Sequence, residues 1–229
     1  LSRYNISTRM RRYDDHASDA VREKLIEQAA SEAVALVSDA GTPLISDPGY
    51  RLVREAREAG VEVTSIPGAC AAIAGLTLSG LPNDRFLFAG FLPVKDKARR
   101  ETLGELAAIP ATLVFYETGP RLVRSLTTLA EIWPEREVAV ARELTKLHEE
   151  CQTGTPRALT AHYTDHPPKG EIVLMVGPPA KTAPDGDPDN LLRAALEDLP
   201  VSKAAGRVAK ATGLDRKTLY ARAMELKEQ

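Results

Sequence analysis

Residues 34–50 read Val-Ala-Leu-Val-Ser-Asp-Ala-Gly-Thr-Pro-Leu-Ile-Ser-Asp-Pro-Gly-Tyr. An apolar run therefore ends abruptly in a loop rich in Asp, Gly, Pro and Ser, and a helical pattern begins just after Pro48-Gly49. A strand that leads through such a loop into a helix is how α/β enzymes bring backbone amides and a carboxylate close to a small ligand. The loop has neither the G-x-G-x-x-G spacing of a dinucleotide site nor the G-x-x-x-x-G-K of a phosphate loop. It predicts a ligand site of another kind.

The composition narrows the class of protein. The 229 residues are 43% hydrophobic and 27% charged, with a formal net charge of −2, so no global field attracts nucleic acid. The two cysteines are far apart and form no C-x-x-C pair, which argues against a disulfide scaffold or a zinc site and fits a reducing compartment. The four histidines have no H-E-x-x-H spacing, so we expect no metal. No apolar run approaches the ~20 residues of a membrane span.

Helices and strands are expected to alternate in the first part of the chain. Helical periodicity covers 17–30, 50–59 and 69–80, and apolar or β-branched runs favour strands at 33–37 and 61–66. The sequence Leu-Pro-Asn-Asp at 81–84 then breaks the pattern. These features predict a first α/β lobe at 1–82.

A second α/β lobe is expected at 83–177. Strands are predicted at 86–89, 112–116, 138–142 and 172–176, with helices at 97–108, 120–132 and 156–164 between them. Because strands separated by such helices are joined by right-handed crossovers, both lobes are expected to hold mostly parallel sheets. The predicted fold class is therefore α/β, with a cleft between two lobes.

The C-terminal part is expected to be helical. Residues 178–190 contain four prolines and are mostly polar, which predicts a linker. Helical patterns follow at 191–199, 202–211 and 216–227, and Thr212-Gly213 separates the last two. Short helices joined by a glycine-containing turn predict a helix-turn-helix-like tail at 191–229.

Several motifs occur in one order along the chain and give it a resemblance to a known family. They are Ser-Asp-Ala-Gly-Thr-Pro-Leu-Ile-Ser-Asp-Pro-Gly-Tyr at 38–50, Pro-Gly-Ala-Cys-Ala-Ala at 67–72, Leu-Pro-Asn-Asp-Arg-Phe at 81–86, Gly-Phe-Leu-Pro at 90–93, Phe-Tyr-Glu at 115–117, Ala-Arg-Glu-Leu-Thr-Lys at 141–146 and Lys-Gly-Glu at 169–171. With these motifs the chain resembles, essentially end to end, the ribosomal RNA small-subunit methyltransferase I group of the tetrapyrrole-methylase superfamily.

The resemblance implies an activity. It implies S-adenosyl-L-methionine as the cofactor and 2′-O-methylation of a cytidine in small-subunit ribosomal RNA as the reaction. The implied partners are that RNA or the 30S subunit and a second copy of the chain, with no membrane, in the cytoplasm. Members of the group begin with a strand that carries Pro-Ile-Gly-Asn-Leu and with an Ala-Glu-Asp-Thr-Arg segment. Residues 1–13 are similar to the stretch directly after those two segments in the group, so we expect an N-terminal segment to be missing.

The resemblance also implies which residues bind the methyl donor. They are Asp39, Gly41, Thr42, Pro43, Ile45, Cys70, Ala71 and Tyr116. Glycine lets a ligand approach the main chain, proline holds a loop rigid, and small residues before a helix leave backbone groups free to reach a ligand. The alternative explanation is an ordinary turn in which Asp39 and Asp47 cap helices.

Charged residues at strand ends are the catalytic candidates. They are Glu117, Glu143, Lys146 and Glu171. A ribose hydroxyl is a weak nucleophile near neutral pH, so a base or a positioned acceptor would help the reaction. A surface or interlobe salt bridge is the more common explanation for any single one of these residues, and the sequence does not choose among them.

Local clusters of basic residues predict RNA contacts. The candidates are Arg99, Arg100, Lys203, Arg207, Arg216 and Lys217. Phosphates favour such clusters even when the whole chain is acidic, although a solvated helix face explains any single run. Aromatic residues make up only 5% of the chain, so one flipped-out nucleotide fits better than a long stacked strand.

Two other functions remain open at this point. One is a tetrapyrrole (precorrin) C-methyltransferase of the same fold, against which the basic clusters and the tail argue. The other is a DNA-binding regulator whose tail uses Gly213, Arg216, Lys217 and Tyr220. The third tail helix carries two basic residues near its start, which is a sparse set for reading duplex DNA.

Overall fold

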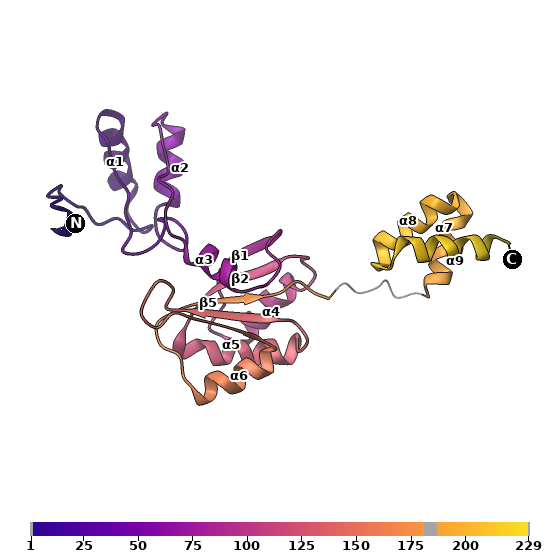
Figure 1. Ribbon diagram of the computed structural model, residues 1–229. Coiled ribbons are helices and arrows are strands. Elements are labelled where there is room, and N and C mark those ends of the chain that lie inside the picture. The colour runs from indigo at the N-terminus through magenta and orange to yellow at the C-terminus, as the bar shows by residue number, and fades with distance from the viewer. Residues whose placement is uncertain (1, 181–186, 229) are drawn as a thin grey trace.

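The computed structural model describes residues 2–180 and 187–228 (Figure 1). The N-terminal part holds a short 3-10 helix and three α-helices, and a sheet with three covering helices follows. The elements are η1 (Ser2–Tyr4), α1 (Asp19–Ser31), α2 (Tyr50–Glu58), α3 (Ala71–Leu78), β1 (Phe86–Phe91), α4 (Asp96–Leu106), β2 (Thr112–Thr118), α5 (Gly119–Ile132), β3 (Val138–Arg142), β4 (Glu150–Gly154), α6 (Pro156–Asp165), β5 (Glu171–Val176), α7 (Pro188–Asp198), α8 (Val201–Thr212) and α9 (Arg216–Glu228).

The five strands form one mixed sheet in the order β1-β2-β5-β3-β4. Strands β1 and β2 are parallel, whereas β5 runs antiparallel to both of its neighbours, β2 and β3. The register pairs Thr118 at the end of β2 with Glu171 at the start of β5, and Arg142 at the end of β3 with Ile172. These ends therefore lie together at one edge of the sheet.

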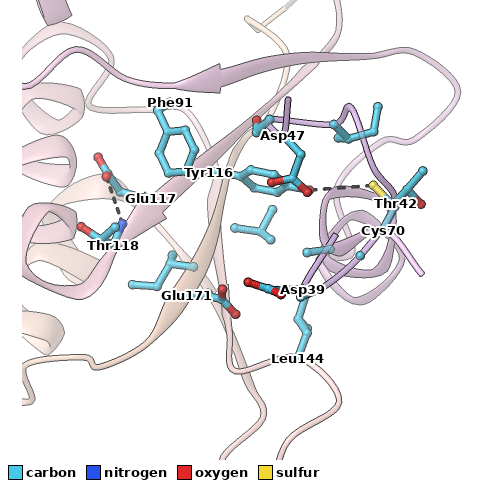
Figure 2. A pocket seen from close by; sticks show the side chains of 17 residues that line it. Asp39, Thr42, Asp47, Cys70, Phe91, Tyr116, Glu117, Thr118, Leu144 and Glu171 are labelled. Carbon is cyan, nitrogen blue, oxygen red and sulfur yellow. Dashed lines mark hydrogen bonds between the residues drawn. The ribbon is translucent and has the colours of Figure 1, made fainter. Parts of the chain in front are cut away.

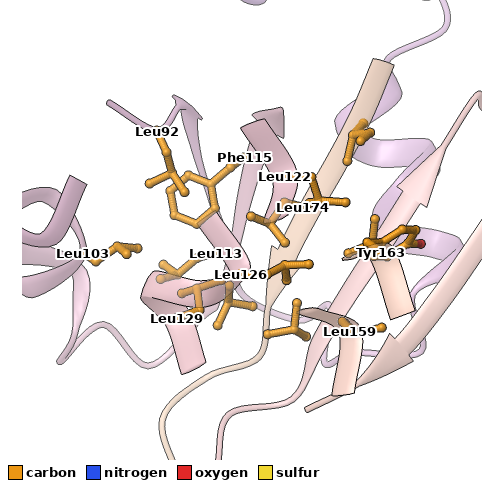
Figure 3. Packing of buried hydrophobic residues seen from close by; sticks show 14 residues of the cluster. Leu92, Leu103, Leu113, Phe115, Leu122, Leu126, Leu129, Leu159, Tyr163 and Leu174 are labelled. Carbon is orange, nitrogen blue, oxygen red and sulfur yellow. The ribbon is translucent and has the colours of Figure 1, made fainter. Parts of the chain in front are cut away.

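The main hydrophobic core lies between this sheet and helices α4, α5 and α6 (Figure 3). Leu122, Leu126 and Leu129 recur at helical spacing along α5, and each is 0% exposed. They pack with Phe115 of β2 and Leu174 of β5, which lie on the same face of the sheet. Burial of this apolar surface is the main force that holds the sheet and its helices together.

Helix α3 covers the opposite face of the sheet. Ala72 and Leu76 pack there with Val173 and Met175 of β5. Gly75 faces the same strand, and a Cβ atom at this position would lie 3.0 Å from the Cβ of Val173. The glycine therefore lets α3 approach the sheet closely and ties the N-terminal part to the core.

The strands predicted at 33–37 and 61–66 are not formed. Among the described residues no strand precedes β1, so 1–82 is not the α/β lobe with a parallel sheet that the sequence predicts. The apolar runs are present, but a strand needs a hydrogen-bonded neighbour, and these segments have none in the part of the chain described. Val37 is 61% exposed and Ile66 is 82% exposed, as expected for unpaired segments.

The one sheet that the described residues form lies in the second predicted lobe and is mixed, so the expectation of a mostly parallel sheet is also wrong. The sequence does not predict β4, which forms an antiparallel hairpin with β3. Residues 143–149 between them are too few for the crossover that parallel neighbours need. The hairpin reverses the direction of the chain, and β5 therefore enters the sheet antiparallel to β2 and β3.

The tail is a bundle of three helices, α7, α8 and α9, which pack on one another through leucine, valine and alanine side chains. Helix α8 ends at Gly213, whose φ of 74° is the left-handed cap that glycine adopts most easily. Residues 181–186 of the linker predicted at 178–190 lie outside the described residues. Asp187 caps α7, which begins at Pro188, so the end of the predicted linker is helical.

Candidate functional site

A cavity of about 460 Å³ lies where the N-terminal loops meet the sheet (Figure 2). The N-terminal part contributes two loops, and the sheet contributes the end of β2 and the start of β5. The lining residues are Asp39, Ala40, Gly41, Thr42, Ile45, Ser46, Asp47, Cys70, Ala71, Phe91, Tyr116, Glu117, Thr118, Leu144, Glu171, Ile172 and Val173. The volume falls in the usual range for small-molecule sites.

The loop at 38–49 is held in an unusual backbone shape. Gly41 has a φ of 70°, and the non-glycine residues Leu44 and Ser46 also have positive φ values, of 72° and 61°. The Thr42 hydroxyl donates a 2.9 Å hydrogen bond to the Ala69 carbonyl, which ties this loop to the segment before α3. Positive φ at non-glycine residues is costly and concentrates at ligand sites, which supports a binding role for this loop.

Tyr116 reaches across the cavity from β2. Its hydroxyl lies 3.8 Å from the Cys70 sulfur and accepts a 3.4 Å hydrogen bond from the Ala72 backbone nitrogen. Its ring makes an edge contact with Phe91, at 5.8 Å between centroids. Burial, followed by the hydrogen bond with Cys70, raises the pKa of Tyr116 to about 12. The side chain therefore stays neutral and joins the sheet to α3.

Two carboxylates from the N-terminal loop line the cavity, those of Asp39 and Asp47. Among the described residues neither carboxylate has a hydrogen-bond or ion-pair partner within the protein. An unpaired carboxylate in a pocket favours a ligand that carries positive charge or N–H and O–H donors. S-adenosylmethionine has all of these, so the residues present fit this group.

Glu117 also lines the cavity, but its carboxylate is fully engaged in the fold. It is 2% exposed, accepts a 2.6 Å hydrogen bond from the Ser125 hydroxyl and lies 3.2 Å from the Arg121 Nε. Its second oxygen also accepts a hydrogen bond from the Thr118 backbone nitrogen, as the dashed line in Figure 2 shows. This arrangement indicates a residue that fixes the end of β2.

The other three catalytic candidates form one ion-pair cluster at the edge of the sheet. The Lys146 ammonium donates 3.1 Å hydrogen bonds to both Glu143 and Glu171. The hydrogen bond from Lys146 lowers the pKa of Glu143, and the bonds to Glu171 and Glu143 raise the pKa of Lys146. Of the three, Glu171 alone lines the cavity.

The structure brings most of the predicted donor-binding residues together. Of the eight, Pro43 does not line the cavity. Phe91 and Leu144 also line the cavity, although neither was predicted as a site residue. The motif Gly-Phe-Leu-Pro at 90–93 contains Phe91, and the motif at 141–146 contains Leu144, so the motifs gave a signal for both.

Arg99, one of the residues predicted to contact RNA, is engaged within the fold. Arg99 is 6% exposed, and its guanidinium donates hydrogen bonds to Thr128, Asp96 and the Pro93 and Val94 carbonyls. Arg100 is paired with Asp96 and Glu131, so its charge is largely neutralised. The four tail candidates are exposed; they are Lys203, Arg207, Arg216 and Lys217.

Among the described residues, no helix is both long and apolar enough to cross a bilayer. No group of three or more His, Cys, Asp or Glu side chains in that part of the chain is placed to hold a metal ion. Cys70 and Cys151 are free thiols.

A cavity with loop, tyrosine and carboxylate walls at the edge of an α/β sheet is the arrangement of a small-ligand site, and a three-helix bundle follows it in the chain. The family model described as Tetrapyrrole (Corrin/Porphyrin) Methylases matches residues 2–160. The chain belongs to this family. A second model, described as RsmI C-terminal HTH domain, matches residues 182–227. The chain is therefore a methyltransferase, with S-adenosylmethionine as its methyl donor.

Curated relatives carry the name Ribosomal RNA small subunit methyltransferase I. The one from Erythrobacter litoralis (strain HTCC2594) is 67% identical over 99% of this chain and 81% of the relative. The one from Escherichia coli O157:H7 is 42% identical over 98% of this chain and 81% of the relative. Among solved structures, the methyltransferase CobJ is 22% identical at a TM-score of 0.54, over 77% of this chain and 80% of that structure. The last likeness supports the fold.

Proposed function

We propose that this protein transfers a methyl group from S-adenosylmethionine to the 2′-hydroxyl of a cytidine ribose in small-subunit ribosomal RNA. The main observation in support is the cavity of about 460 Å³, which is lined by the loop at 39–47, the end of β2 and the start of β5. The name shared by relatives of up to 67% identity supports the RNA substrate. The match of the tail to the RsmI C-terminal HTH domain favours RNA over a tetrapyrrole substrate or a DNA regulator.

The cavity residues bind and orient the donor. When bound, S-adenosylmethionine supplies a methyl group on a positively charged sulfur that an oxygen nucleophile attacks in line. The Asp39 and Asp47 carboxylates favour the positively charged donor over the product, which has lost that charge. Phe91 and Tyr116 supply apolar walls that exclude water, and Gly41 lets the ligand approach the backbone.

Glu171 is our choice for the group that accepts the ribose proton as the new oxygen–carbon bond forms. It lines the cavity with an exposed carboxylate, whereas both oxygens of Glu117 are engaged in the fold. Lys146 and Glu143 act as positioning residues, because they hold Glu171 at the edge of the sheet. Glu171→Gln is expected to lower kcat by about 10- to 100-fold and to leave the affinity for S-adenosylhomocysteine unchanged.

The tail supplies phosphate contacts. Lys203 and Arg207 lie one turn apart on α8, and the Arg216 guanidinium reaches the same helix with a 3.3 Å hydrogen bond to the Ser202 hydroxyl. Lys217 follows at the start of α9. Because each phosphate contact releases a counterion, removing Lys203 and Arg207 together should lower the salt dependence of RNA binding.

The proposal extends to assembly and location. Edge strand β1 exposes Phe86 and Phe91, which supports a homodimer through this edge. A substrate in the ribosomal subunit and two free thiols support the cytoplasm. Light scattering tests the first point.

The experiment is methyl incorporation from labelled S-adenosylmethionine into 30S subunits that lack the modification. Calorimetry with S-adenosylhomocysteine accompanies it, on this chain and on a chain extended by the group's N-terminal segment. Asp39→Asn is expected to weaken donor binding about tenfold or more, whereas Asp165→Asn, on the exposed end of α6, should not change it. Absence of both donor binding and methylation in both forms would overturn the proposal.

A further inference from the structure

A second cavity, of about 310 Å³, lies on the other face of the sheet. It is lined by Arg142 at the end of β3, Glu150 at the start of β4, His162 and Tyr163 of α6, and His166, Pro167 and Pro168 beyond that helix. Arg142 follows Val138 and Val140 at alternate positions of β3, which pack toward α5 and α6. The donor cavity, in contrast, includes Val173, which packs toward α3.

The two cavities open near the same edge of the sheet. Arg142 lines the second cavity, and its partner in the strand register is Ile172, which lines the first. The chain between them is the loop at 143–149, in which Glu143 and Thr145 have positive φ values of 49° and 64°. A single strand of nucleic acid that crosses this loop can therefore reach both cavities.

The second cavity combines opposite charges with flat surfaces. The Arg142 Nε donates to a Glu150 carboxylate oxygen, and the His162 Nε2 lies 3.8 Å from the other oxygen of that carboxylate. The rings of His162 and His166 are stacked, 5.0 Å apart at an angle of 25°. The two prolines give a rigid apolar wall. The Glu150 carboxylate would repel an anion. A planar group whose edge carries both hydrogen-bond donors and acceptors would not be repelled, because it could face both Arg142 and Glu150.

Tyr163, which lines this cavity, carries a buried polar atom that has no partner within the described part of the protein. Tyr163 is 1% exposed, and its hydroxyl makes no hydrogen bond in the described structure. Burial raises the pKa of Tyr163, Glu150 raises it further and Arg142 lowers it, so the hydroxyl lies near this pair. Buried hydroxyl groups in native proteins are nearly always paired with protein, water or a ligand, so this hydroxyl has an unused hydrogen bond beside the cavity.

We propose that the second cavity receives one unstacked base of the RNA substrate, stacked on the His162–His166 pair and hydrogen-bonded along its edge by Arg142 and Glu150. The inference rests on the proposed function, because it supplies the RNA. Protein sites for single-stranded RNA use this combination of stacking on aromatic rings and polar contacts to the base edge. The volume suits one base with its ribose rather than two stacked nucleotides.

Steady-state kinetics on 30S subunits test the proposal. The double variant His162→Ala/His166→Ala is expected to raise the KM for the subunit about tenfold, as loss of a base stack does, with kcat unchanged. His16→Ala, an exposed histidine that lines neither cavity, is the matched control and should leave KM unchanged. Unchanged KM in the double variant of an active enzyme would overturn the inference. Absence of methylation and donor binding in the unmodified protein would instead overturn the proposed function.

A second measurement does not depend on methylation. Cytidine and guanosine monophosphates, but not ribose 5-phosphate, are expected to shift the NMR signals of His162 and His166 and to leave the signals of His16 unaffected. An equal response to ribose 5-phosphate would show an anion site and overturn the base assignment. Binding of free nucleotides with no change in KM for the subunit would show a nucleotide site unrelated to the RNA.

Tyr163→Phe sharpens the argument, because it removes only the hydroxyl. The variant is expected to unfold at the same temperature as the unmodified protein or higher, and to raise the KM severalfold. A lower unfolding temperature would show that the hydroxyl already has a partner, and would overturn its use as evidence of a ligand.

Discussion

The two walls of the donor cavity are built in opposite ways. The wall on the sheet comes from β2 and β5. Phe115 of β2 and Leu174 of β5 are 0% exposed and belong to a continuous core. The other wall comes from loops with positive φ values, tied by single hydrogen bonds such as Thr42 to Ala69 and Gly49 to Asp15. One wall is a rigid platform, and the other is shaped by local backbone geometry.

The difference shows how stability and binding are divided in this molecule. Apolar side chains in the loop region, such as Val37 and Ile66, stay in solvent and add little to folding. Stability in proteins is not uniform, and segments that bind ligands are commonly drawn from the weaker part. The donor is therefore expected to order the loop wall while the sheet stays unchanged.

The largest contrast is expected from the same substitution in each region. Val140→Ala, at a 0% exposed position in β3, should lower the free energy of unfolding by about 2 kcal/mol, because it leaves a cavity in the core. Val37→Ala, at a 61% exposed position, should change it by less than about 0.5 kcal/mol. Urea denaturation measures both. Equal losses would contradict the division between the two walls.

The contact between the two regions gives the next effect. Gly75→Leu should push α3 away from Val173, at a cost of about 1–3 kcal/mol, and should weaken S-adenosylhomocysteine binding because Cys70 and Ala71 lead directly into α3. Gly104→Ala is the control, since a Cβ in this part of α4 meets nothing within 4 Å, and it should stabilise by about 0.5–1 kcal/mol. Unchanged donor affinity in a folded Gly75→Leu variant would show that α3 does not position this wall.

The same contrast explains how far the sequence could predict the structure. The helices and the strands β1, β2, β3 and β5 carry their apolar pattern locally, and the Gly/Pro/Asp loop indicated the donor cavity. Strand β4 was missed because its sequence, Glu-Cys-Gln-Thr-Gly at 150–154, is polar and lies at the edge of the sheet. The burial of Arg99 was not predicted, because its partner Thr128 comes from another helix and such a contact is not visible in a local charge pattern.

A smaller effect is expected where the loop at 143–149 meets the sheet. Gly170 has a φ of 85°, and a Cβ there would lie 2.0 Å from the Glu143 Oε1, so Gly170→Ala should displace this carboxylate from Lys146. We expect the free energy of unfolding to fall by about 1–2 kcal/mol, because alanine is strained in the left-handed backbone conformation. The pKa of Glu143, which Lys146 lowers, should rise toward its usual value in an NMR titration. Gly60→Ala has the same strain, at a φ of 80°, without a neighbour within 4 Å, and should leave this pKa unchanged.

The smallest effect concerns the tail, whose core is built largely from alanine and leucine and which we expect to depend on an ion pair. The Asp189 carboxylate accepts hydrogen bonds of 2.9 and 3.1 Å from the Arg222 Nε, and this contact lowers the pKa of Asp189. Because the pKa is lower in the folded state, the stabilisation is present above the ordinary aspartate pKa of about 3.9 and is lost as the pH falls through the lowered value. Urea unfolding of the tail, followed by the methyl NMR signal of Ala223 between acid and neutral pH, should show this loss. Asp189→Asn should flatten the dependence of the free energy of unfolding on pH, whereas Asp198→Asn, on the exposed end of α7, should keep its slope. Equal slopes in the two variants and the unmodified protein would show that the ion pair adds nothing to stability.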